Sequence, residues 1–293
     1  MQPLTIGNIV NVSINLYRQN FKLYLRLALF AFLWLLVPLY GWAKFLANSA
    51  LISRLTFNEL IGKPETLKSA RSYLKTRTWG FLFTTILVFS ALIFTLLISF
   101  ILASIIIWMI FITPALRSSL EILIGETFVT NNFLFGLLFL FTFTFLLFAL
   151  YFGATWWLYC RLFFASLPLA IEKQVNPIQT IFRSFKLTKN YFFNLQGIAI
   201  IVSLAIAPLE FTLYLIALAF FGIFSLLTSN IDPNYQIYYS ITLEIFYTII
   251  AGVNLVILLP FLQCIKTVIY YNLLLRREGF DLDLARNNYP KLN

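Results

Sequence analysis

Six long apolar runs, separated by short segments rich in Lys and Arg, constrain this chain of 293 residues more than any other feature. The runs cover residues 23–41, 42–60, 79–113, 133–160, 191–228 and 241–265. A helix that crosses a membrane needs about 20 consecutive apolar residues. Hydrophobic residues make up 61% of the chain and charged residues 11%, against about 45–50% and about 25% in soluble domains. The sequence therefore predicts an all-α integral membrane protein built as a six-span helical bundle.

The basic residues divide unequally between the two ends of these runs. Of the 21 Lys and Arg, 19 lie in or next to four segments: the N-terminal segment, the C-terminal tail and the segments 61–78 and 161–190. Only Lys44 and Arg117 fall on the other side. Cytoplasmic loops of membrane proteins retain Lys and Arg. This asymmetry predicts that both termini are cytoplasmic, and it accounts for the net charge of +10 without a nucleic-acid partner.

Three of the runs leave alternatives open. Pro38 and Gly41 predict a turn that divides residues 23–60 into a hairpin of two short helices. One kinked span is the alternative, but it would place the basic segment 61–78 outside. The run 191–228 is longer than a bilayer requires, so we expect strong tilt or a break near Pro208. Strong tilt is also the expectation for the run 79–113.

Short basic amphipathic segments precede three of the runs, at residues 4–20, 64–78 and 177–190. The last two begin with Pro, as many helices do. All three end in a polar or basic residue followed by an aromatic one, which is typical of an interfacial helix that turns into a span. We therefore predict a single membrane domain made of three repeats, each an interfacial helix plus a hairpin. The predicted repeats cover residues 1–62, 63–175 and 176–293.

The chain offers little catalytic chemistry. It contains no His, the commonest general base and metal ligand. Its two Cys, Cys160 and Cys264, are too few for a disulfide framework. The sequence also lacks metal-ligand spacings, Gly-rich phosphate loops and nucleophile motifs. We therefore expect no catalytic residue, no cofactor and no metal, and a protein that is not an enzyme.

Polar residues at membrane depth form the first group of candidate sites, because they are costly to place there. Glu210 follows Pro208 by two residues in an apolar run, and Asn254 stands close to Gly252. Together they are candidates for an intramembrane polar site. In the alternative interpretation, Glu210 marks a helix end at the membrane interface, and Asn254 holds two helices together.

Basic residues at the predicted cytoplasmic boundary form the second group. Clusters of this kind hold anionic headgroups or dock a partner protein. The candidates for lipid or partner contact are Arg71, Arg161, Arg183, Lys186, Lys189, Arg276 and Arg277. Arg54 and Arg161 have two alternatives: to reach the headgroups, or to pair with Glu59 and Glu172 respectively.

Two motifs carry a resemblance to a known family. The first, before the run 191–228, includes Glu172, Arg183, Ser184, Leu187 and Thr188; the second, in the tail, includes Tyr270, Tyr271, Leu273, Arg276, Arg277, Glu278, Gly279, Phe280 and Asp281. Both resemble a bacterial family of multi-span proteins described as the glycerophosphodiester phosphodiesterase membrane domain and its relatives of unknown function. The resemblance implies a multi-pass protein of a bacterial plasma membrane or an internal photosynthetic membrane. It does not imply phosphodiesterase activity, because that activity belongs to a separate catalytic domain that needs His.

Together these observations favour a non-enzymatic accessory, assembly or scaffold factor. Its basic cytoplasmic helices would contact partner proteins and membrane lipids. The alternative is a carrier of lipid or small molecules, with a site between repeats near Glu210 and Asn254, because internal repeats and broken helices recur in transporters. An intramembrane enzyme is the third hypothesis and would have to use Glu210, Arg161 or Arg54.

Overall fold

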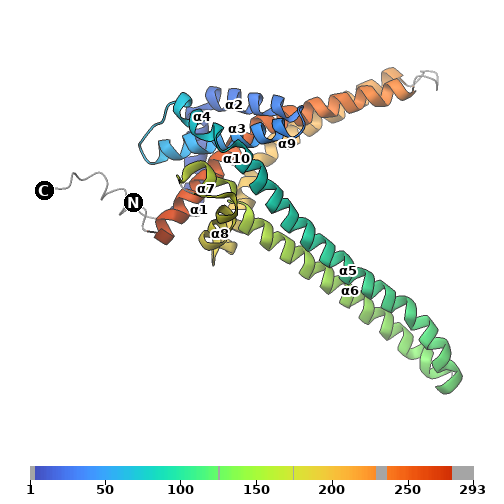
Figure 1. Cartoon of the computed structure of the whole chain (residues 1–293). Helices are drawn as coiled ribbons and strands as arrows, with labels where there is room; N and C mark the ends of the chain where they lie inside the picture. Colours follow the sequence, from blue (N-terminus) through green and yellow to red (C-terminus); the bar gives the residue numbers. More distant parts are fainter. Residues whose placement is uncertain (1–3, 125, 174, 229–235, 279–293) are drawn as a thin grey trace. The chain divides into compact units, whose positions relative to one another are not determined.

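The computed structural model describes residues 4–124, 126–173, 175–228 and 236–278, which form ten α-helices and no strand (Figure 1). The all-α prediction is confirmed. In chain order the helices are α1 (Ile6–Gln19), α2 (Phe21–Leu35), α3 (Tyr40–Leu60), α4 (Leu67–Lys75), α5 (Thr78–Ile124), α6 (Glu126–Leu162), α7 (Ser166–Ile171), α8 (Pro177–Thr188), α9 (Phe192–Thr228) and α10 (Gln236–Glu278).

The chain divides into two compact units. The first contains residues Met1–Thr85 and Phe164–Asn293, and the second contains Ile86–Phe163. Within the described residues, a short helix followed by two longer ones occurs three times, starting at α1, α4 and α8. This order follows the three predicted sections, although α2 and α3 are much shorter than their counterparts. The repeat itself remains a prediction.

The C-terminal half of α10 is the centre of the first unit. Helices α1, α2, α3 and α8 all pack against α10 (Figure 1). One buried cluster includes Tyr24, Leu51 and Phe81, with exposed fractions of 1% each. A second cluster joins Ala28 and Ala31 of α2 to Leu259 of α10. Small side chains on α2 let its backbone approach α10 closely, so the N-terminal segment is held against the last helix.

Residues 23–60 form a hairpin, which confirms the predicted turn. Helix α2 ends at Leu35 and α3 begins at Tyr40, with the rings of Trp34 and Tyr40 at 5.7 Å in an edge-on contact. A Cβ added at Gly41 would lie 2.0 Å from the carbonyl oxygen of Trp34. Only glycine therefore fits at this point of the turn, because the obstacle is backbone rather than a side chain that could move.

Four helical stretches of the described chain are long and apolar enough to cross a membrane: Thr78–Leu102, Phe141–Ile171, Phe192–Phe224 and Ser240–Glu278. Helices α2 and α3 are not among them. The 15 residues of α2 extend only about 22 Å, less than the roughly 30 Å of a hydrocarbon core. Several apolar helices of spanning length thus agree with a multi-pass membrane protein, but four spans are supported rather than six.

Helix α9 continues from Phe192 to Thr228 with Pro208 inside it, so of the two alternatives for this run the break near Pro208 is wrong. Proline removes one backbone hydrogen bond. A break would expose several more backbone groups to an apolar environment, where each unsatisfied group is costly. The 37 residues of α9 extend about 55 Å and the 43 of α10 about 64 Å. Both helices are longer than a whole bilayer of about 40–45 Å.

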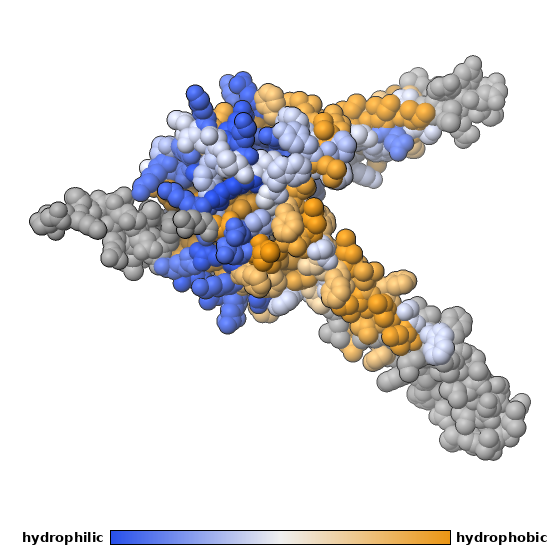
Figure 2. Space-filling view, viewed as in Figure 1, coloured by the Kyte–Doolittle hydropathy of each residue, from blue (hydrophilic) through white to orange (hydrophobic). Residues whose placement is uncertain are grey.

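Hydrophilic and hydrophobic side chains are separated in the first unit. Figure 2 shows hydrophilic side chains gathered over α1, α4 and α8, and hydrophobic ones along the free lengths of α9 and α10. Exposed apolar residues on α9 include Leu204 at 68% and Phe211 at 61%. Such surfaces suit contact with lipid tails, whereas the hydrophilic end suits water and headgroups.

Candidate functional site

An ion pair joins α3 to the segment before α4. The Arg54 Nε atom donates to Oε2 of Glu65 at 2.7 Å, and Arg54 Nη1 donates to the carbonyl of Ala170 at 2.9 Å. Glu65 also accepts from Asn58 and Ser69, both at 2.7 Å. Burial raises the pKa of the Glu65 carboxyl, but the hydrogen bonds from Arg54, Ser69 and Asn58 outweigh it and hold the pKa below its usual value.

The alternative pairing of Arg54 with Glu59 is wrong. Five helix positions separate the two residues, so their side chains point about 140° apart around the helix axis. The Glu59 carboxylate instead accepts from Asn20 Nδ2 at 2.7 Å and from the Tyr24 hydroxyl at 3.4 Å. Glu59 therefore fixes the junction between α1 and α2 against the end of α3.

Two arginines enclose the ring of Tyr73. The guanidinium carbons of Arg54 and Arg77 lie 3.7 and 4.5 Å from the ring centroid. The Tyr73 hydroxyl donates to the carbonyl of Glu172 at 2.6 Å, and Arg77 donates to the same carbonyl at 2.8 Å. Carbonyls at a helix C-terminus lack partners within the helix. Arg77 and Tyr73 donate hydrogen bonds to such a carbonyl, that of Glu172, at the end of α7. Neither residue was singled out from the sequence.

Arg183 connects α8 to both α7 and α10. Its Nε atom donates to Glu172 Oε1 at 3.0 Å and its Nη2 atom to Glu278 Oε2 at 2.6 Å. The Tyr270 hydroxyl donates to the same Glu172 oxygen at 2.5 Å. Burial alone lowers the pKa of the Arg183 guanidinium, but the carboxylates of Glu278 and Glu172 more than offset this and raise it. Arg183 therefore holds α8 against the end of α7 and the end of α10, and it is also a predicted lipid contact.

The tail motif also makes internal contacts. Asn272 accepts from the backbone N–H of Leu4 at 2.9 Å and donates to the Tyr191 hydroxyl at 3.2 Å. Arg276 donates to the carbonyl of Leu4 at 3.0 Å, and Arg277 donates to the carbonyl of Lys189. These bonds hold the starts of α1 and α9 against the last turns of α10. The remaining motif residues Gly279, Phe280 and Asp281 lie outside the described part of the chain.

The second unit contains one of the predicted basic contacts. The Arg161 guanidinium lies 4.4 Å from the ring centroid of Trp157, near the end of α6. The Glu172 carboxylate, considered as an alternative partner for Arg161, is held by Arg183 and Tyr270. Stacking on an indole anchors Arg161 where aromatic side chains and basic residues meet a membrane interface.

Acidic and basic side chains of the first unit differ in exposure. Of the six acidic residues described there, Glu210, Glu244 and Glu278 are exposed. The acidic side chains of Glu59, Glu65 and Glu172 are half-buried and face partners inside the unit. Twelve basic residues described in the same unit are exposed: Arg18, Lys22, Arg26, Lys63, Lys68, Arg71, Lys75, Lys173, Lys186, Lys189, Arg276 and Arg277. The surface over α1, α4 and α8 therefore carries a large excess of positive charge, and we call it the basic surface.

Helix α8 turns its hydroxyl side inward and its apolar side outward. Thr180, Ser184 and Thr188 are buried, whereas Ile178 and Phe182 are exposed by 55% and 69%. Thr180 and Thr188 bond to carbonyls within their own helix at 2.6 and 2.8 Å, so neither buried hydroxyl lacks a partner. An exposed apolar face beside exposed lysines is the arrangement of a helix that lies in a membrane interface.

The intramembrane candidates Glu210 and Asn254 lie at the same level without a described contact. Phe220 stacks on Phe246 at 3.5 Å, and Tyr191 meets Asn272, so α9 and α10 run antiparallel in a register that places Glu210 level with Asn254. Glu210 is exposed. The Asn254 Oδ1 atom is buried and has no hydrogen-bond partner within the described residues.

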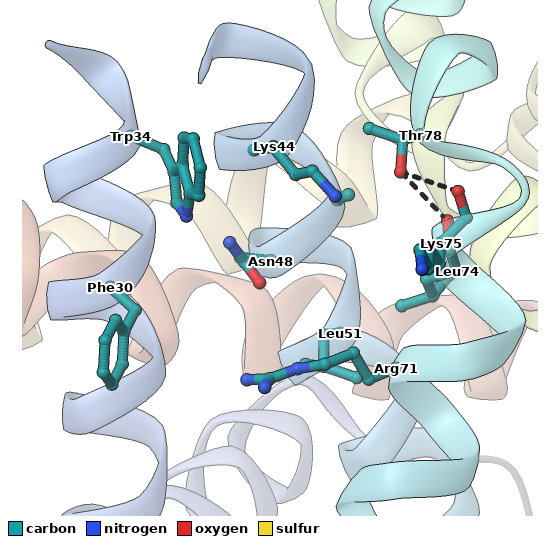
Figure 3. Close-up of a pocket in the computed structure, with 10 residues that line it drawn as sticks. Phe30, Trp34, Lys44, Asn48, Leu51, Arg71, Leu74, Lys75 and Thr78 are labelled. Carbon is teal, nitrogen blue, oxygen red and sulfur yellow. Dashed lines mark hydrogen bonds between the residues drawn. The ribbon is translucent and has the colours of Figure 1, made fainter. Parts of the chain in front are cut away.

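A pocket of about 400 Å³ lies between the α2–α3 hairpin, α4 and the start of α5 (Figure 3). It brings Lys44 together with Arg71 and Lys75. The sequence had placed Lys44 on the opposite side of the membrane from Arg71 and Lys75, and that assignment is wrong. Residues that share one small pocket cannot be separated by a hydrocarbon core of about 30 Å. The sequence had not grouped these three cations.

Comparison with known proteins gives no match: no family model matches the chain, and neither a curated protein nor a solved structure matches it. The resemblance carried by the two motifs therefore remains an expectation. Among the residues that the structure describes, no group of three or more His, Cys, Asp or Glu side chains could hold a metal ion. The candidate site thus consists of the basic surface and the pocket beside it.

Proposed function

We propose that this protein is a non-enzymatic accessory factor of a bacterial membrane, which assembles or supports other proteins through its basic surface. The observation that carries the proposal is the excess of exposed positive charge on the basic surface: Glu59, Glu65 and Glu172 face inward, while twelve Lys and Arg stay exposed. Exposed cations concentrated on one face attract anionic headgroups and acidic protein surfaces. The internal pairs keep that face rigid, as a docking surface requires.

The proposed arrangement places both termini and the basic surface in the cytoplasm. Four long helices cross the membrane, and the α2–α3 hairpin stays on the cytoplasmic side. In support, the ring of Tyr40 at the hairpin turn lies 6.4 Å from Trp79, which stands at the start of α5. The turn is therefore level with the beginning of a span rather than with its far end. Three repeats of unequal size complete the arrangement.

Cysteine labelling tests this topology. Cysteines introduced at Lys44 and Lys75, each in a chain with Cys160 and Cys264 replaced by Ser, should react with a membrane-impermeant thiol reagent from the same side. A cysteine at Lys186 serves as the reference for the basic surface. Labelling of the Lys44 position from the opposite side would reject the arrangement.

The second unit supports a role in contacting other membrane proteins. Its described side chains are largely exposed and include several aromatic ones, with exposed fractions of 72% for Phe100, 71% for Phe141 and 66% for Phe145. Phe side chains carry large apolar areas that dominate interfaces when they become buried. Two long helices with such surfaces can pack against a neighbouring membrane protein as well as against lipid.

Native purification from the source membrane, followed by mass spectrometry, tests the accessory function. We expect one protein to co-purify in a fixed stoichiometry. Reversing charge with Lys186→Glu and Lys189→Glu should reduce its recovery several-fold, because both side chains lie on the basic surface. The matched control is Lys186→Arg with Lys189→Arg, which changes the same two exposed side chains but keeps both positive charges. A chain that purifies alone in every condition would reject the proposal.

A carrier is the second candidate function, and one observation favours it. The buried Oδ1 atom of Asn254 has no partner in the described chain, and an orphan acceptor of this kind is suited to bind a donor group on a ligand. The matching test is mass spectrometry of small molecules and lipids bound to wild-type protein and to Asn254→Leu. A molecule retained by the wild type and lost from the variant supports the carrier, and identical profiles reject it.

A further inference from the structure

The pocket beside the basic surface has one charged wall and one apolar wall. Lys44 comes from α3, and Arg71 and Lys75 come from α4. In Figure 3 Lys44 and Asn48 project from α3, and the Arg71 side chain extends from α4 across α3 toward α2. The hydroxyl of Thr78 is at the same end, where it bonds to carbonyls of α4. The polar groups thus converge from three helices.

No carboxylate lines this pocket. The ion pairs of the described residues join Arg54 to Glu65, and Arg183 to Glu172 and Glu278. None of them involves Lys44, Arg71 or Lys75. The contact described for Lys44 is with the ring of Tyr40, at 5.4 Å from the centroid. Three cations gathered without an acid repel one another, so an anion that enters the pocket is stabilised by all three.

The opposite wall of the pocket is apolar. Phe30 and Trp34 come from α2, one helical turn apart, and Leu51 and Leu74 lie at the base. Beyond this wall, apolar side chains of α2 and of the turn that follows it are exposed, with exposed fractions of 48% for Leu33 and 75% for Leu36. A ligand suited to both walls has an anionic head and an apolar tail.

We propose that the pocket binds the phosphodiester headgroup of an anionic phospholipid. Arg71, Lys75 and Lys44 contact the phosphate oxygens, Asn48 donates to a headgroup oxygen, and the acyl chains leave along Phe30 and Trp34. Arginine matches phosphate with two parallel donors, and lysine adds point charges. The bound lipid joins the α2–α3 hairpin to α4. This proposal deepens the lipid contact of the proposed function, on which it rests, but it requires no partner protein.

Titration of delipidated, detergent-purified protein with a short-chain phosphatidylglycerol, followed by native mass spectrometry, tests the site. We expect the triple variant Lys44→Gln, Arg71→Gln and Lys75→Gln to lose at least about tenfold in affinity, since each cation near a membrane surface contributes several-fold. The matched control is Lys63→Gln with Lys68→Gln, two exposed basic residues beside or on α4 that do not line the pocket. The control should stay within about twofold of wild type. Circular dichroism and size-exclusion elution verify that both variants fold.

Titrations with other ligands distinguish a lipid headgroup from a soluble phosphate as the anion that the pocket binds. Phosphatidylcholine should bind more weakly than phosphatidylglycerol, because its choline group faces three cations. Glycerol phosphate and inorganic phosphate should bind far more weakly than the lipid, and Trp34→Ala should weaken the lipid but not these soluble anions. If soluble phosphates bind as tightly as lipid, the site serves a soluble anion and the proposal fails. Equal losses in the pocket variant and the control would show diffuse charge attraction and would also overturn it.

Discussion

Phe81 and Phe94 lie on the same helix, α5, yet the first is 1% exposed and the second 64% exposed. Phe81 belongs to the first unit and is part of a buried core cluster, whereas Phe94 belongs to the second unit. In the first unit, tertiary packing and ion pairs between distant segments hold the helices together. In the second, helical hydrogen bonds and the surrounding apolar medium have to supply most of the stability. The same residue type therefore has a different role in each unit.

The largest effect should come from truncating these two phenylalanines. Phe81→Ala should destabilise the first unit by about 3–5 kcal/mol, because it leaves a cavity in a packed core. Phe94→Ala should change the free energy of unfolding by less than about 0.5 kcal/mol. Thermal denaturation in mild detergent, followed by size-exclusion chromatography, measures both. Similar losses for the two variants would show that the second unit is packed as tightly as the first.

An intermediate effect is expected for the ion pairs of α8. Arg183→Ala should cost about 1–2 kcal/mol, between the values for exposed and fully buried pairs, because the side chains of Arg183 and Glu278 are 25% and 28% exposed. Lys186→Ala, three residues along the same helix and exposed, is the control. Hydrogen exchange should show α8 losing protection only in the Arg183 variant. Equal exchange in both variants would contradict the assignment of Arg183 as the tie between α8 and α10.

The smallest effect concerns pH. The Glu65 carboxyl has its ordinary pKa of about 4.5 when the chain is unfolded and a lower pKa when it is folded. Between the two values the unfolded chain binds more protons, so stability rises with pH there. The stabilisation is complete above the unfolded pKa and is lost as the pH falls through the folded pKa. Denaturation midpoints measured from about pH 7 to about pH 3 should fall more steeply for wild type than for Glu65→Gln. Coinciding slopes would show that the pairing with Arg54 does not depend on the charge of Glu65.

The helices themselves could be predicted closely from the sequence, because their signals are local. The turn between α2 and α3 follows from Pro38 and Gly41, and the start of α8 follows from Pro177 after Asn176, whose side chain takes part in a capping box. The alternative of a break at Pro208 was wrong, because a local preference competes with the cost of opening a helix in an apolar environment. Helix existence was thus more predictable than helix continuity.

The candidate site could be predicted only in part. Arg71 and Arg183 were selected from the sequence as basic residues of the predicted cytoplasmic boundary, a role that remains a prediction, but the residues that lie beside them were not predicted. Arg54 pairs with Glu65 rather than with Glu59. Lys44 lines the same pocket as Arg71 and Lys75, a grouping that the charge count had excluded. Charge counting assigns each residue to a side according to its neighbours in sequence. Charge counting cannot detect a short helical hairpin that turns back before it crosses the membrane.

The sequence by itself determined an all-helical, apolar chain with basic segments between its long runs, because hydrophobic length and residue type act over a few turns of helix. It also determined which residue types could carry function, since the chain has no His and few acids. Only the tertiary structure decided which acids are paired within the first unit, which cations remain exposed and which three surround one pocket. Those outcomes depend on contacts between residues up to 272 positions apart, as between Leu4 and Arg276. Packing geometry fixes such contacts, and no local pattern encodes it.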